Sequence, residues 1–138
     1  MPNNSPIPKE ERLVAIVDDD VSVRQSARRL IRSLGYRAEA FGSAEEFLGS
    51  GQATTAACLI LDVGMPRIDG LELQRRLAGS AIPIVFITAR ASEEEERRAL
   101  RAGAVAFLRK PVDNEALLRV LGAVLEKSES DGGSHETD

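Results

Sequence analysis

The feature that most constrains this chain is a set of short apolar runs, each of which stops at a polar residue. The clearest run is Ala56–Leu61, which ends at Asp62. A run of this length between turn residues predicts a strand buried on both faces, and such strands belong to parallel sheets that helices cover. Comparable runs occupy Leu13–Val17, Pro83–Ile87 and Ala104–Leu108. The chain is therefore expected to fold around a parallel sheet.

The segments between these runs have the apolar spacing and the end signals of helices. Ser43 with Glu46 and Ser92 with Glu95 fit the capping-box pattern, and Asp20 is expected to cap the first helix. Helices are predicted from Val21 to Leu34, from Ser43 onward, from Gly70 to Ala78, from Ser92 to about Ala102 and from Asp113 to Glu126, with an alternating edge strand over Tyr36–Phe41. Five strands alternating with five helices predict an α/β fold with a doubly wound, five-stranded parallel sheet.

Composition sets further limits. The 138 residues suffice for one domain with its own core, and a net charge of −4 gives this chain no electrostatic basis for binding nucleic acid directly. The single cysteine, Cys58, excludes an internal disulfide and is expected to be an inert core residue. No apolar stretch approaches the roughly 18 residues that span a bilayer, so we expect a cytoplasmic protein without a membrane partner. A flexible lead over 1–11 and a disordered acidic tail over 128–138 leave 12–127 as the folded domain.

Polar side chains stand where the predicted strands end. Asp18 and Asp19 follow the first apolar run, Asp62 follows the third strand, and Thr88 and Lys110 follow the last two. Each alone would suggest a helix cap, a strand-end hydrogen bond or a surface charge. Because the carboxyl ends of parallel strands meet at one edge, the five together predict a crevice for a ligand. Three carboxylates favour Mg²⁺, and the hydroxyl and the ammonium group suit phosphate oxygens.

The remaining composition narrows the chemistry of this crevice. The only histidine, His135, lies in the predicted tail, so a serine or cysteine nucleophile would lack a base. One cysteine and one histidine also exclude a zinc cluster, and the glycine-rich phosphate loop of nucleotide-binding proteins is missing from the sequence. An aspartate carboxylate that attacks phosphorus and forms an acyl phosphate remains as the predicted chemistry.

The same residues resemble a known family. The stretches Val17–Asp19, Leu61–Gly70, Ile87–Ala89 and Phe107–Pro111 resemble the receiver domain of two-component response regulators. The resemblance covers residues 12–127 and implies a flavodoxin-like fold with strand order 2-1-3-4-5. The amino-acid sequence of residues 102–107, before Lys110, is similar to that of the nitrogen-fixation-type branch of the family.

The resemblance implies a role for each acidic residue. Asp62 would accept a phosphoryl group from a sensor histidine kinase or a histidine phosphotransfer protein. Asp19 would ligate Mg²⁺ directly, with Mn²⁺ able to substitute, and Asp18 would act through a water molecule. Gly64 would offer its backbone carbonyl to the same ion. The domain would then be a signalling element that phosphorylates and dephosphorylates itself, without a separate turnover substrate.

The resemblance also implies a conformational switch. Thr88 and Lys110 would contact the phosphoryl oxygens, and Thr88 with Phe107 would form the switch, the ring following the hydroxyl inward. The change would be displayed on the face made by the fourth helix, the fifth strand and the fifth helix, where partners dock or a homodimer forms on phosphorylation. The bond between Lys110 and Pro111 would be cis.

Two departures and several alternatives stay open at this point. Gly64 has no side chain to orient an attacking water, and Arg90 brings a long cation near the phosphate, so the lifetime of the acyl phosphate is open. The domain could be a stand-alone relay or phosphate sink, a constitutive interaction module, or a Mg²⁺-dependent phosphatase with an aspartyl nucleophile. The phosphatase usually needs a second Asp where Gly64 stands. The few large apolar residues between Glu93 and Ala102 predict a loosely held output helix.

Overall fold

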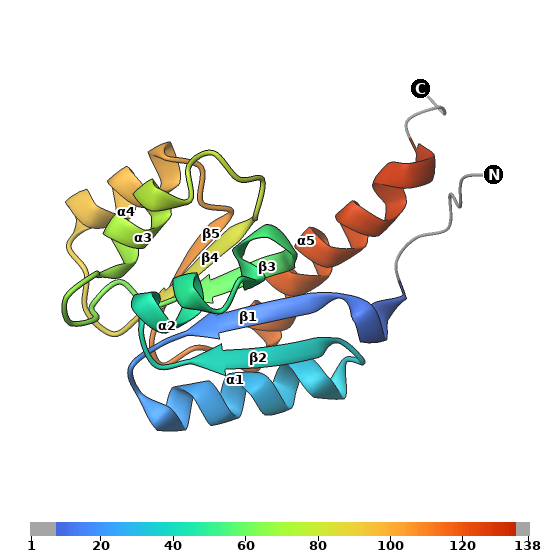
Figure 1. Cartoon of the computed structure of the whole chain (residues 1–138), viewed down its shortest axis with the longest axis horizontal. Coiled ribbons are helices and arrows are strands. Elements are labelled where there is room, and N and C mark those ends of the chain that lie inside the picture. Colours follow the sequence, from blue (N-terminus) through green and yellow to red (C-terminus); the bar gives the residue numbers. More distant parts are fainter. Residues whose placement is uncertain (1–7, 135–138) are drawn as a thin grey trace.

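The computed structural model describes residues 8–134, and their five strands form one parallel sheet in the order β2-β1-β3-β4-β5 (Figure 1). The strands are β1 (Leu13–Val17), β2 (Arg37–Phe41), β3 (Ala56–Leu61), β4 (Ile84–Thr88) and β5 (Ala106–Arg109). The helices are α1 (Val21–Ser33), α2 (Ala44–Gly49), α3 (Gly70–Arg76), α4 (Glu93–Arg101) and α5 (Asn114–Ser134), with short 3-10 turns at Lys9–Glu11 and Gln52–Thr54. The predicted α/β class and the strand order are confirmed.

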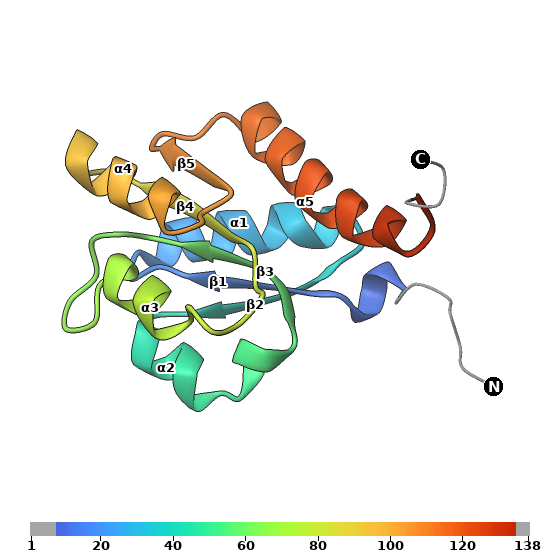
Figure 2. The ribbon, with the colours of Figure 1, turned by 90° about the horizontal axis from the view of Figure 1, so that it is seen from above.

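Helices cover both faces of the sheet (Figure 2). Because side chains alternate along a strand, β1 sends Ala15 and Val17 to one core and Val14 and Ile16 to the other. The first core is closed by α2, α3 and α4, and the second by α1 and α5. Cys58 is fully buried in the second core, and burial raises the pKa of its thiol to about 12, as expected for an inert core residue.

The predicted helix starts are largely found. Asp20 caps α1 by accepting from the backbone N–H of Ser22, and Ser92 and Glu95 form the reciprocal capping box of α4. The box predicted at Ser43 is only half formed, since the Glu46 carboxylate accepts from the N–H of Gly42 and not from that of Ser43. A carboxylate at this position satisfies an N–H one residue earlier than the pattern predicts.

The chain ends differ from the prediction in two ways. Helix α5 runs to Ser134, not to Glu126, so residues 128–134 of the predicted tail are helical. Extending an existing helix adds one hydrogen bond for each residue fixed and needs no new nucleus, and tail composition does not reveal this. The predicted lead contains the 3-10 turn Lys9–Glu11. Residues 1–7 and 135–138, including His135, lie outside the described part of the chain.

Strand β5 begins at Ala106, two residues later than predicted. The N–H of Ala104 instead bonds the carbonyl of Ala99 and closes the end of α4, while that of Val105 bonds the carbonyl of Ile84 on β4.

Among the helices of residues 8–134, none combines the length and the apolar composition needed to cross a bilayer.

Candidate functional site

Backbone pairing fixes the two central carboxylates. Val17 lies opposite Leu61 in the β1–β3 register, so Asp18 and Asp62 leave neighbouring strands side by side. The N–H of Asp62 donates to the carbonyl of Val17 at 3.0 Å. Because these are backbone contacts between buried central strands, the sheet itself sets where the two aspartates stand.

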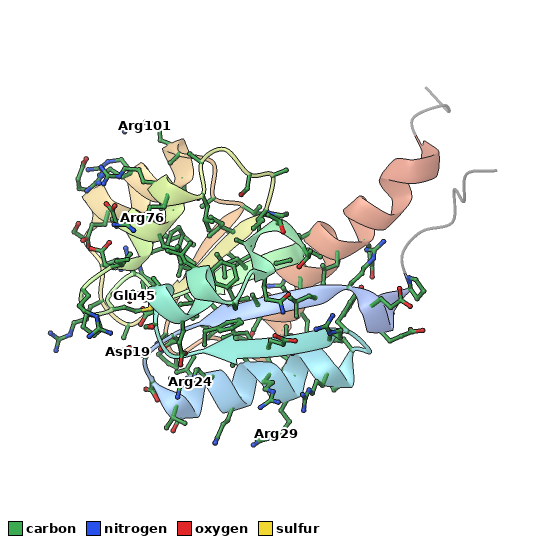
Figure 3. All side chains as sticks on the ribbon, in the orientation of Figure 1. Asp19, Arg24, Arg29, Glu45, Arg76 and Arg101 are labelled. Carbon is green, nitrogen blue, oxygen red and sulfur yellow. The ribbon has the colours of Figure 1, made fainter. Side chains whose placement is uncertain are left out.

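Three carboxylates gather at this edge of the sheet. One oxygen each of Asp18, Asp19 and Asp62 lies within 4.8 Å of the other two. Asp18 and Asp62 are buried, whereas Asp19, which is labelled in Figure 3, is exposed, so the cluster opens to solvent on the side of Asp19. Burial raises the pKa of Asp18, although the N–H of Asp20 and the ammonium group of Lys110 offset part of that rise.

The donor set fits a hard divalent cation. Carboxylate oxygens are the ligands that Mg²⁺ prefers, and they would approach it from the buried and the exposed sides together. Gly64, whose backbone carbonyl was predicted as a further ligand, lies exposed in the loop after β3, and a Cβ built there meets nothing within 4 Å. An ion here would offset the cost of burying the charged Asp18 carboxylate, and that burial is the main cause of its raised pKa.

Lys110 brings a positive charge to the same edge from β5. Its Nζ lies 3.0 Å from Oδ2 of Asp18 and 3.9 Å from Oδ2 of Asp62. The backbone N–H of Lys110 donates to the carbonyl of Thr88 at 2.8 Å. The peptide bond between Lys110 and Pro111 is cis, as the resemblance implied. The lysine therefore lies where it could meet an anionic group attached to Asp62.

The loop between β3 and α3 passes close to Asp62. Gly64 donates its N–H to Oδ1 of Asp62 at 3.3 Å, and Gly70 donates to the carbonyl of Val63 at 2.9 Å. A Cβ at Gly70 would overlap the backbone oxygen of Asp62, so this position requires glycine. Arg67 holds a left-handed φ of 65° and pairs with Glu45 of α2, which ties the loop to the neighbouring helix.

Thr88 is buried at the end of β4 but faces its own loop. Its hydroxyl donates to the carbonyl of Arg90 at 3.0 Å and accepts from the N–H of that residue at 3.3 Å. The expected bond to a phosphoryl oxygen would need the hydroxyl to leave the Arg90 carbonyl. Thr88 therefore lies at the edge of the site, but its hydroxyl is engaged in hydrogen bonds with the backbone of its own loop.

Phe107, the other predicted switch residue, lies half-buried between two layers. Its ring centroid is 5.7 Å from that of Phe86 in the core, and the guanidinium of Arg109 lies 5.4 Å from it on the outside. The N–H groups of Arg109 also donate to the carbonyl of Ala91 and to Glu96. Sequence reasoning did not single out this arginine, because a basic residue at the end of a strand is usually a solvated charge.

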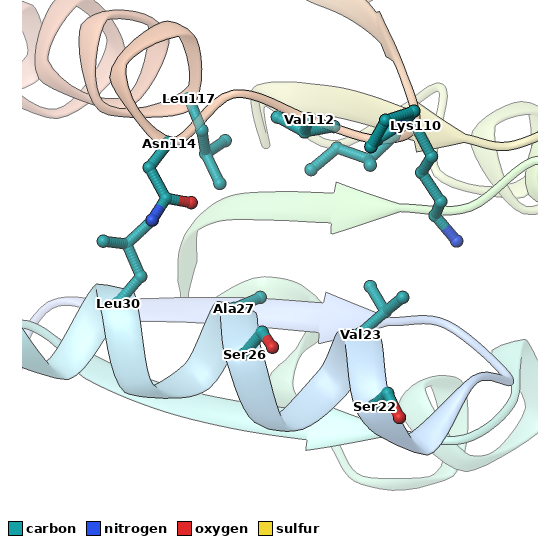
Figure 4. A pocket seen from close by; sticks show the side chains of 11 residues that line it. Ser22, Val23, Ser26, Ala27, Leu30, Lys110, Val112, Asn114 and Leu117 are labelled. Atoms are coloured by element: carbon teal, nitrogen blue, oxygen red, sulfur yellow. The ribbon is translucent and has the colours of Figure 1, made fainter.

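A groove borders the site on the other side of Lys110 (Figure 4). It has a volume of about 260 Å³ and lies between α1 and the connection from β5 to α5. Its lining is mostly apolar and includes Val23, Leu30 and Val112, with Ser22 and Ser26 along α1. The predicted site thus continues into a surface that reaches from Lys110 along α1.

Comparison with known proteins accounts for this arrangement. The family model described as the response regulator receiver domain matches residues 14–122. The chain is 40% identical over 119 residues to response regulator protein TmoT of Ectopseudomonas mendocina, covering 85% of this chain and 54% of that protein. It is 42% identical over 117 residues to nodulation protein W of Bradyrhizobium diazoefficiens, covering 83% of this chain and 52% of that protein.

A solved structure agrees with these relatives. A response regulator receiver protein from Burkholderia phymatum superposes with a TM-score of 0.75 at 46% identity, covering 84% of this chain and 96% of that chain. The chain spans about half the length of the curated relatives it matches and nearly the whole of this receiver structure. What is shared is therefore the receiver part of longer regulators.

Proposed function

The chain belongs to the response regulator receiver domain family, and on that premise we propose that it is a phosphorylation-controlled signalling switch whose phosphoacceptor is Asp62. The observation that carries the proposal is the cluster itself. Three carboxylates share one edge, and the ammonium group of Lys110 lies 3.9 Å from Asp62. An acidic crevice that also holds a cation suits a metal ion and a phosphoryl group together.

In the proposed reaction a carboxylate oxygen of Asp62 attacks the phosphorus of a phosphohistidine. The new bond is O–P, the bond that breaks is P–N, and the imidazole leaves with the electron pair of that bond. Mg²⁺, with Mn²⁺ able to replace it, would neutralise phosphoryl oxygens and be held by Asp19 directly, by Asp18 through water and by the carbonyl of Gly64. Lys110 would move from Asp18 to a phosphoryl oxygen.

The switch follows from the same chemistry. Once Asp62 carries a phosphoryl group, the Thr88 hydroxyl would exchange its bond to the Arg90 carbonyl for one to a phosphoryl oxygen. Phe107 would then move inward against Phe86. Phosphorylation would thereby shift a resting equilibrium and alter the face made by α4, β5 and α5, on which a homodimer or a partner could form.

The proposed phosphodonor is a sensor histidine kinase or a histidine phosphotransfer protein in the cytoplasm. We infer that the donor rests on the groove between α1 and Val112, since the groove begins beside Lys110 and its lining is largely apolar. A donor seated there would present its phosphohistidine toward Asp62. Direct binding of nucleic acid by this chain is not part of the proposal, because its net charge is −4.

The test is incubation with acetyl phosphate and Mg²⁺, followed by native size measurement and by assay of p-nitrophenyl phosphate turnover. One hydroxylamine-sensitive phosphoryl group per chain, formed only with the metal, is expected for the receiver. A shift to dimer would support an output through the α4-β5-α5 face, and an unchanged monomer would support a relay or phosphate sink. Steady turnover of the ester would instead establish an aspartyl phosphatase and contradict the proposal.

A further inference from the structure

One guanidinium joins three parts of the switch side of the molecule. Nη1 of Arg109 donates to the carbonyl of Ala91 at 2.7 Å, and Nη2 donates to Oε1 of Glu96 at 2.8 Å. The same group lies over the outer face of the Phe107 ring, 5.4 Å from its centroid. Arg109 therefore connects the end of β5 to the β4–α4 loop, to the first turns of α4 and to the predicted switch aromatic.

We propose that Arg109 is a positioning residue that holds the β4–α4 loop in its resting arrangement and so weakens the binding of a phosphoryl group at Asp62. This inference rests on the proposed function. It adds the residue that sets the resting equilibrium, which neither the family match nor the relatives assign.

The loop is held at two consecutive carbonyls. The Thr88 hydroxyl donates to the carbonyl of Arg90, and Arg109 donates to the carbonyl of Ala91, the next residue. For Thr88 to donate to a phosphoryl oxygen, the first of these bonds must break, which releases the Arg90 carbonyl so that the loop can change its path. The second bond opposes that change, because the Ala91 carbonyl would have to leave the guanidinium.

Helix α4 depends on such polar contacts more than its neighbours do. Of its nine residues only Ala99 is buried, whereas the six-residue α2 buries both Ala44 and Phe47. With so little apolar area to hold it, α4 is positioned by the bonds of Arg109 and by that of Gln74 to the Ala99 carbonyl. Release of Arg109 thus frees the loop and the start of the helix together.

The contact also explains why arginine stands here. A guanidinium offers several N–H groups in a fixed plane, so it can reach a carbonyl and a carboxylate while its face lies on a ring. The Arg97–Glu94 pair on the same helix is a single contact between side chains that are 58% and 61% exposed. Such a pair does not hold the loop. Substitution of Arg97 is therefore a matched control, because it also removes one arginine from this region.

The direction of the effect follows from population shift. A ligand that favours the rearranged loop binds more weakly when a contact of the resting loop must first be broken. Removal of that contact should therefore tighten binding of a phosphoryl analogue. The expected size is about fivefold, at the lower end of typical coupling between two sites.

The experiment is a titration of the whole chain with beryllium fluoride at saturating Mg²⁺, followed by amide NMR of Ala89–Ala91. Arg109→Ala should bind about fivefold more tightly than the unmodified chain, Arg109→Lys should fall between the two, and Arg97→Ala should match the unmodified chain. In the absence of ligand, the Arg109→Ala amide signals should move part of the way towards their ligand-bound positions, a change that plain loss of stability would not produce. Glu96→Gln supplies a second variant that should bind more tightly if Arg109→Ala does not fold.

The outcomes separate the two proposals. An unmodified chain that binds no beryllium fluoride contradicts the phosphoacceptor function, and the role of Arg109 falls with it. An unmodified chain that binds, together with folded Arg109 variants of equal or weaker affinity, overturns the role of Arg109 alone. Equal tightening in Arg97→Ala would also overturn it, since the effect would then belong to surface charge and not to the loop contact.

Discussion

The two halves of the strand-end edge are held by different kinds of contact. On the β1–β3 side, Asp18 and Asp62 leave buried central strands, and Gly70 packs directly against the backbone of Asp62. On the β4–β5 side, Thr88 leads into exposed residues, and α4 is held largely by hydrogen bonds from Gln74 and Arg109. Packing thus fixes the half that would bind the metal and accept the phosphoryl group, while the half that would respond can move without opening the core.

Gly70→Ala should damage the fixed half most. The new Cβ would meet the backbone oxygen of Asp62 and lie 2.9 Å from Cα of Val63, and neither atom can move aside as a flexible side chain could. We expect a loss of about 2–3 kcal/mol in the free energy of unfolding, measured by urea denaturation. Gly49→Ala, where a Cβ meets nothing within 4 Å, is the control and should be neutral or slightly stabilising. Equal effects of both substitutions would contradict the close packing.

Mg²⁺ should stabilise the fixed half through its carboxylates. At a concentration 100 times its Kd, the ion should raise the free energy of unfolding by about 2.7 kcal/mol. Asp18→Asn should greatly reduce this increase, because one carboxylate of the cluster is lost. Glu93→Gln, which removes an exposed carboxylate in the first turn of α4, should leave the increase unchanged. A full Mg²⁺ response in Asp18→Asn would contradict the assigned cluster.

Gln74→Leu should loosen the responsive half alone. The substitution removes the side-chain donor to the carbonyl of Ala99 at similar side-chain volume and leaves the N–H of Ala104 as its remaining donor. Opening of α4 should become easier by about 1 kcal/mol, seen as faster hydrogen exchange of its amides, while those of α1 stay unchanged. If α4 of the unmodified chain proved as protected as β1 and β3, the contrast between the two halves would be wrong.

The pH dependence of stability should show a smaller effect of Asp18. Burial raises its pKa above 3.8, so the folded state holds this proton to higher pH than the unfolded state does. The resulting stabilisation is present below the unfolded pKa and is lost as the pH rises through the folded one. Without divalent ions, Asp18→Asn should therefore lose less stability than the unmodified chain between about pH 4 and pH 7, in urea titrations. A steeper loss of stability in Asp18→Asn would contradict a raised pKa of Asp18 in the folded state.

The sequence predicted the arrangement of the strand ends well because the signals for it are local. Short apolar runs that end at Asp18, Asp62, Thr88 and Lys110 indicate buried parallel strands, and strand ends of a parallel sheet share one edge. The structure brings the three carboxylates and Lys110 together there. Their roles as metal ligands, phosphoacceptor and phosphate contact stay predictions until chemistry tests them.

The responsive half was less predictable because its contacts join distant residues. Gln74 bonds α4 at a residue 25 positions along the chain, and Arg109 bonds the β4–α4 loop at a residue 18 positions away. Contacts at such sequence separations produce no periodic pattern that the sequence could reveal. The end of α5 was missed for another reason, since a polar composition near a chain end suited disorder as well as helix. Placement in the nitrogen-fixation-type branch of the family also stays a prediction.

Intact mass measurement after reaction with acetyl phosphate tests the central claim most directly. The unmodified chain should gain the mass of one phosphoryl group with Mg²⁺ and none without it. Asp113→Ala, which alters an exposed carboxylate before α5, should gain the same mass, whereas Asp62→Ala should gain none while remaining folded. A phosphoryl group of undiminished amount on Asp62→Ala would contradict the account.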